Sequence, residues 1–211
     1  MLTEQTKVFE HTLYIDIPEK FTFKEDPTLE DITMADKFRF ISRIKQSAEQ
    51  QINFYRRTLD SLDNKLVRQL QEATLCQDEF AEVIINCVDS AIKKNKEHKE
   101  KQDSVEIKIS LAIKNQTPII KIKDNGSGHP DLEQGEKKEY IPDFSATEKT
   151  SNKRSSSYAK YYIGGTGVGL STFAYNAANR TEGLSLKMKN RQQTSGMTLE
   201  IHSLQKIEED G

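Results

Sequence analysis

The feature that most restricts the fold of this chain is a glycine-rich segment that runs directly into a helical pattern. Four glycines lie within residues 164–169, and residues 170–179 then have the apolar spacing of a helix. Glycines immediately before a helix leave backbone N–H groups free to bind phosphate oxygens, and the helix dipole favours the negative charge. The segment lacks the Gly-Lys-Ser/Thr ending of a P-loop, and no strand enters it at the distance that a dinucleotide-binding turn requires. We therefore expect a phosphate-binding loop of another type.

A helix expected at residues 78–96 carries polar residues on one face. Glu82, Asn86 and Asp89 are spaced by four and three positions, so they lie on the same side of an otherwise apolar helix. The carbonyl oxygen of Asn86 is a suitable hard ligand for magnesium, and the Glu82 carboxylate can accept a proton from a hydroxyl group or a water. Taken alone, the same pattern also fits the solvated face of an amphipathic helix.

A strand expected at residues 119–122 leads to Asp124, which two glycines, Gly126 and Gly128, follow closely. A carboxylate at the end of a strand can accept a hydrogen bond from an exocyclic amine. Glycines let the backbone approach a flat ring. By itself, the segment is equally compatible with a plain Asp-Asn-Gly turn.

Together with a short alternating strand that contains Thr198, these segments resemble, in order, the N, G1, G2 and G3 boxes of the GHKL superfamily (gyrase, heat-shock chaperone, histidine kinase and MutL). The resemblance runs from about residue 78 to 204. It implies a Bergerat-type α/β fold, an α+β sandwich whose mixed, mostly antiparallel sheet has helices on one face. It also implies a mobile ATP lid, which we expect at about residues 130–163.

The resemblance implies ATP and Mg2+ as cofactors and gives roles to individual residues. It assigns the magnesium ion to Asn86, base catalysis to Glu82, recognition of the adenine amino group to Asp124 and support of that aspartate to Thr198. The further nucleotide-binding residues that it implies are Asp89, Gly126, Gly128, Lys149, Gly165, Thr166, Gly167, Val168, Gly169 and Leu170.

Within the superfamily, the chain is most similar to the catalytic domain of histidine kinases. Residues 142–149 look like the kinase sequence Pro-Phe-Phe-Thr-Thr-Lys, which would let Lys149 reach the terminal phosphate as a point charge. Sensor kinases carry their phosphoacceptor histidine on a preceding helical hairpin, but residues 34–70 contain no histidine. We therefore expect transfer of the γ-phosphate to a separate protein acceptor. The alternative is a non-catalytic, nucleotide-switched regulatory module or a slow ATPase.

Apolar residues spaced by three and four positions across 34–70 predict a helix or helical hairpin, and alternation at 7–17 predicts a strand. The helix is expected either to form a homodimer or dock a partner, or to pack on its own ATP-binding domain. The expected divisions of the chain are an N-terminal strand and linker (1–30), a helical segment (31–76), the ATP-binding domain (77–206) and a tail (207–211).

Composition restricts the partners and the location. Charged residues cancel to a net charge of -2, so no basic excess is available to neutralise nucleic-acid phosphates. No apolar run approaches the roughly 20 residues of a membrane span. The two cysteines, Cys76 and Cys87, are expected as reduced thiols. We expect a cytoplasmic protein that binds neither nucleic acid nor a membrane.

Overall fold

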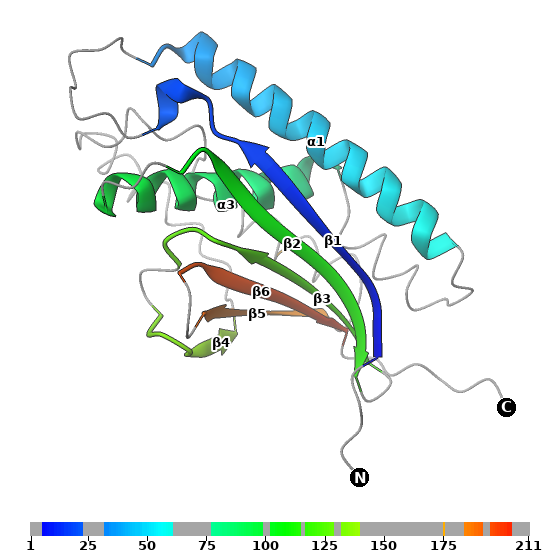
Figure 1. Ribbon diagram of the computed structural model, residues 1–211. Coiled ribbons are helices and arrows are strands. Elements are labelled where there is room, and N and C mark those ends of the chain that lie inside the picture. The colour runs from blue at the N-terminus through cyan, green and yellow to red at the C-terminus, as the bar shows by residue number, and fades with distance from the viewer. Residues whose placement is uncertain are drawn as a thin grey trace, which may run out of the picture.

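The fold is a single sheet with helices on one face (Figure 1). It is seen in a computed structural model, which describes residues 6–22, 32–60, 77–98, 102–114, 117–128, 132–139, 175, 184–191 and 195–203. The strands, in chain order, are β1 (Thr6–Asp16), β2 (Ser104–Lys114), β3 (Thr117–Asp124), β4 (Lys137–Glu139), β5 (Leu184–Asn190) and β6 (Met197–Ser203). The helices are α1 (Met34–Asp60), α3 (Gln77–His98) and a short 3-10 helix, η1 (Glu19–Phe21).

The six strands are ordered β1-β2-β3-β6-β5-β4 across the sheet. Every pairing between these strands is antiparallel, and the parallel element among the described residues is an isolated bridge between Gln134 and Asn190. The predicted α/β sandwich with a mostly antiparallel sheet is confirmed.

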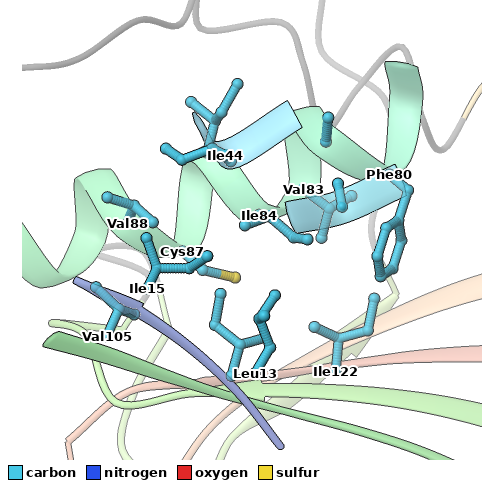
Figure 2. Close-up of a cluster of buried hydrophobic side chains, with 14 of the residues drawn as sticks. Leu13, Ile15, Ile44, Phe80, Val83, Ile84, Cys87, Val88, Val105 and Ile122 are labelled. Atoms are coloured by element: carbon cyan, nitrogen blue, oxygen red, sulfur yellow. The ribbon is translucent and has the colours of Figure 1, made fainter. Parts of the chain in front are cut away.

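Strict alternation in the central strands divides the sheet into two faces. On β2, Val105, Ile107, Ile109 and Leu111 are buried toward the helices, whereas Lys108 is exposed on the other face. The other face of the sheet is called the open face below. Figure 2 shows the core between the helices and the sheet, where Ile84 and Val88 of α3 meet Leu13, Ile15 and Ile122 of the strands.

Helix α1 is part of this core. Thr33 caps its first turn, because the Thr33 Oγ accepts a hydrogen bond from the Asp36 N–H at 3.2 Å and the Asp36 carboxylate accepts one from the Thr33 N–H at 3.0 Å. Its buried side chains recur every four residues, at Phe40, Ile44, Ala48 and Ile52. The helix therefore covers β1 and packs beside α3, as Figure 1 shows.

The apolar face of α1 agrees with the predicted one only in part. The predicted face included Met34 and Phe38, but these side chains are 64% and 62% exposed. Ala48 and Ile52, which also belonged to the predicted face, are buried as expected, and Phe40 and Ile44 complete the buried face in place of Met34 and Phe38. The predicted helix extended to residue 70, and its last part, 61–70, lies outside the described residues.

The predicted lid is also partly corrected. Residues 137–139, within the expected lid of 130–163, form β4 and pair with β5. This strand was missed because it is only three residues long, and its side chains, Lys137, Lys138 and Glu139, are all exposed and show no apolar alternation. Leu132, just before it, is buried in the core. A lid would therefore have to lie beyond β4, outside the described residues.

Candidate functional site

Asp124 is a buried carboxylate at the C-terminal end of β3. It is 2% exposed and lies opposite Ile107 on the face of the sheet that α3 covers. Its Oδ1 accepts hydrogen bonds from the Gly126 N–H at 2.8 Å and the Met197 N–H at 3.4 Å. Burial raises the pKa of Asp124 to about 6, and these two bonds and the Arg191 charge act in the opposite direction.

The loop after Asp124 is fastened to α3. Ser127 N–H donates to the Ser90 Oγ at 3.0 Å and to the Ser90 carbonyl at 3.2 Å. A Cβ atom on Gly126 would lie 2.4 Å from the Ser90 Oγ, so only glycine permits this approach. Asn125 ties the same loop to β2, because its Oδ1 accepts a hydrogen bond from the Glu106 N–H at 3.1 Å.

The backbone conformation and the surroundings of Gly128 both require glycine. Its φ of +82° lies in the left-handed region, and an added Cβ would come within 2.8 Å of the Asn190 Oδ1. Asn190 in turn donates to the Leu132 carbonyl at 2.7 Å. Gly128 thus makes room for the contact between β5 and the segment that precedes β4. Its predicted role in shaping a base pocket stays a prediction.

Helix α3 presents Glu82, Asn86 and Asp89, and all three side chains are half-buried. The Asn86 Nδ2 donates to the backbone carbonyl of Glu82 at 2.9 Å. Because the amide nitrogen is engaged in this way, the carbonyl oxygen of Asn86 is the atom left for a ligand. A predicted base, Glu82, lies one turn before it on the same face.

The side chains on α3 fit a magnesium ion that takes most of its ligands from elsewhere. Within the described part of the chain, no three His, Cys, Asp or Glu side chains converge to form a metal cage. Mg2+ usually keeps several waters and binds through one or two protein oxygens together with substrate phosphates. The neutral oxygen of Asn86 suits that arrangement.

Thr198 does not occupy the predicted position. It pairs with Lys123, one residue before Asp124, and alternates with Leu199 and Ile201, which face the helices. Its side chain is therefore on the open face, away from the Asp124 carboxylate. The residue of β6 that reaches Asp124 is Met197, through its backbone N–H. The predicted support of Asp124 by the Thr198 hydroxyl is wrong by one position in the register.

Two further contacts at Asp124 were not expected from the sequence. Arg191 Nη1 donates to the Asp124 carbonyl at 3.1 Å, and Gly196 packs against that carbonyl so closely that a Cβ would lie 2.1 Å from its oxygen. These residues are about 70 positions from Asp124, so no local pattern connects them. The one sequence signal for these contacts was a glycine directly before a strand, and a glycine does not show which residue it will contact.

Several predicted phosphate-side residues lie outside the described residues. They are Lys149, Gly165, Thr166, Gly167, Val168, Gly169 and Leu170. The described structure thus contains Asp124 with its loop and the polar face of α3, and the assignments for the glycine-rich segment stay predictions.

A family model described as histidine kinase-, DNA gyrase B-, and HSP90-like ATPase matches residues 76–206. The match covers more than half of the chain. This chain belongs to that ATPase family. The predicted GHKL resemblance is thereby confirmed, and membership supports ATP as the ligand of the domain. Searches of curated proteins and of solved structures found no match.

The family match begins just before α3, so β1 and α1 precede it. Both nevertheless belong to the same core as the ATPase motifs, through Leu13 and Ile15 on β1 and Ile44 on α1. No helix in the described ranges is long and apolar enough to span a membrane.

Proposed function

We propose that this protein binds Mg-ATP and transfers the γ-phosphate to a separate protein, as a histidine-kinase-like phosphotransferase. The observation that carries the proposal is the placement of Asp124. Its carboxylate is buried at a strand end, is held by backbone N–H groups through one oxygen, and lies on the side of the sheet that α3 covers. If the base of a nucleotide binds at Asp124, the polar residues of α3 are available to bind the phosphates of that nucleotide.

Asp124 would select the base. Its carboxylate can accept a hydrogen bond from the exocyclic amine of adenine, whereas guanine presents a carbonyl oxygen at that position. An unpaired buried polar group costs about 1–3 kcal/mol, so affinity for ATP should exceed that for GTP about tenfold or more. Calorimetric titration with both nucleotides measures this ratio, and equal affinities would exclude the role of Asp124.

The α3 residues would act at the phosphate end. Asn86 would hold magnesium through its carbonyl oxygen, and the bound ion would neutralise charge on the phosphates. Glu82 would orient the acceptor group and take its proton as the acceptor oxygen or nitrogen bonds to the γ-phosphorus. The bond from that phosphorus to the β-phosphate oxygen breaks, and ADP leaves with the electron pair.

Two α3 variants and one control test these roles. Asn86→Ala should lose the magnesium-dependent part of ATP affinity. Glu82→Ala should keep ATP affinity and lose turnover, because it removes a proton acceptor and not a nucleotide ligand. Glu49→Ala, which removes an exposed carboxylate on α1, should change neither. Undiminished turnover in Glu82→Ala would make Glu82 structural.

Incubation with ATP that is labelled on its γ-phosphate distinguishes phosphotransfer from ATP hydrolysis and from nucleotide binding alone. Transfer to a co-purified or added protein in a Glu82-dependent manner supports the kinase. ATP consumption without labelled protein would indicate a slow ATPase. Tight ATP binding with neither turnover nor label would indicate a nucleotide-switched regulatory module, and the proposed phosphotransfer would be abandoned.

A further inference from the structure

The two described ends of the turn between β5 and β6 lie beside Asp124. Of this connection, the structure describes Arg191, Ser195 and Gly196. The Arg191 N–H donates to the Gly196 carbonyl at 3.1 Å, which joins the two ends of the turn. Gly196 has a φ of +110°, in the left-handed region that favours glycine. The turn therefore has a defined shape at its base.

This turn contacts Asp124 at three points. The guanidinium of Arg191 donates to the Asp124 carbonyl at 3.1 Å. The Met197 N–H reaches the carboxylate Oδ1 at 3.4 Å. Gly196 packs on the Asp124 backbone, where a Cβ would come within 2.1 Å of the carbonyl oxygen and 3.1 Å of the Asn125 Cα. The turn thus holds both the backbone and the side chain of the residue proposed to read the base.

We propose that Arg191 is a positioning residue for base recognition, which fixes the end of β3 and favours the ionised form of the Asp124 carboxylate. The proposal rests on the proposed function, in which that carboxylate accepts a hydrogen bond from the adenine amine. Arg191 acts on the Asp124 carboxylate through its charge and through its bond to the Asp124 carbonyl, and it does not itself contact the nucleotide.

The electrostatic surroundings of Asp124 make Arg191 the important charge. On α3, the buried thiol of Cys87 interacts electrostatically with Asp124. Burial and the Asp124 charge both raise the pKa of this thiol, so it is neutral. From β2, Asp124 meets the apolar side chain of Ile107. Among the described residues, Arg191 is the cation that lowers the pKa of Asp124 against the effect of burial. A hydrogen bond to an ionised acceptor is roughly twice as strong as one to a neutral acceptor.

Two measurements on three variants test the proposal. The pKa of Asp124 is followed by NMR of its side-chain carboxyl carbon without nucleotide, and ATP affinity is measured by calorimetry at pH 6 and pH 8. Arg191→Met removes the charge and the donor. Arg191→Gln removes the charge and keeps a donor for the carbonyl. Lys189→Met is the matched control, because it removes a cation from β5 on the open face.

Both Arg191 variants should raise the pKa of Asp124, and Lys189→Met should leave it unchanged. If the pKa rises from about 6 by about one unit, the ionised fraction at pH 6 falls about fivefold and ATP affinity falls with it, whereas at pH 8 it falls by only about a tenth. Arg191→Met should also lose ATP affinity equally at both pH values if the hydrogen bond to the Asp124 carbonyl matters, and Arg191→Gln should not show this additional loss.

An unchanged carboxyl titration and unchanged ATP affinity in Arg191→Gln would overturn the proposal, as would an equal pKa shift in Lys189→Met. Arg191→Gln decides the question if Arg191→Met does not fold. The NMR titration needs no nucleotide. If wild-type protein fails to bind ATP, the proposed function fails, and the titration still shows whether Arg191 controls the ionisation of Asp124.

Discussion

Truncation of Ile44 on α1 should destabilise the whole ATPase domain. The Ile44 side chain is 0% exposed and lies in the core with α3 (Figure 2). Ile44→Ala deletes three carbon atoms, which corresponds to about 2.4 kcal/mol at roughly 0.8 kcal/mol per buried methylene. The cavity left behind adds to this, so we expect a loss of about 3–4 kcal/mol in the free energy of unfolding, within the usual range of about 2–5 kcal/mol.

Phe38→Ala on the same helix is the control. It deletes a larger side chain, but Phe38 is 62% exposed, so the loss should be below about 0.5 kcal/mol. Urea unfolding followed by circular dichroism measures both. With a slope of about 2 kcal/mol per molar urea, the midpoint should fall by about 1.5–2 M in Ile44→Ala and by less than about 0.3 M in Phe38→Ala.

Equal midpoint shifts in the two variants would refute the placement of α1 in the core.

The same experiment tests the proposed homodimer through this helix, whose exposed flank contains Met34 and Phe38. If the helix also forms a dimer, the wild-type midpoint rises with protein concentration. Phe38→Ala should then remove that dependence while the protein stays folded. A midpoint independent of concentration would exclude a dimer that contributes to stability.

Three further predictions concern charge and the lid. Burial raises the folded pKa of Asp124 from 3.8 to about 6, so ionisation of this carboxylate opposes folding at higher pH. Asp124→Asn should therefore stabilise the nucleotide-free protein at pH 8 by about 1–3 kcal/mol. The same variant should bind ATP at least tenfold more weakly. Conversely, His202, Lys137 and Lys121 hold the pKa of Glu200 well below its usual value of 4.5. The resulting stabilisation is fully present above the unfolded pKa and is lost as the pH falls toward the folded pKa. Glu200→Gln should therefore lower the urea midpoint at pH 7, and its difference from wild type should shrink steadily as the pH falls below about 4.5. In hydrogen exchange, ATP should slow residues 140–163 and leave β4 unchanged; equal protection with and without ATP would exclude a lid there.

The strands and the start of the site were predictable because they depend on local patterns. Alternating apolar residues fix which face of β2 is buried, and an aspartate followed by closely spaced glycines identifies the end of β3. Both follow from the chemistry of a few consecutive residues. The polar face of α3 was predictable for the same reason, since spacings of three and four positions place Glu82, Asn86 and Asp89 together.

The errors arose where distant segments decide the outcome. On α1, both Phe38 and Phe40 are apolar, and only the position of the domain selects Phe40 for burial. On β6, the choice between Met197 and Thr198 depends on the register with β3, which the sequence of β6 alone does not contain. The contact of Arg191 with Asp124 likewise requires β5, β6 and β3 to be assembled first.

The pairing of β1 with β2 has a consequence for how the protein is made. Asp16 pairs with Ser104 and Thr6 with Ile113, so about 90 residues separate the two partners at the near end. At about 5–20 residues per second of synthesis, β1 leaves the ribosome roughly 5–18 s before β2 exists. During that interval Leu13 and Ile15 have no sheet to join, and both edges of the strand are open to other chains. The newly made N-terminal segment is therefore the part of this protein that we expect chaperones to protect.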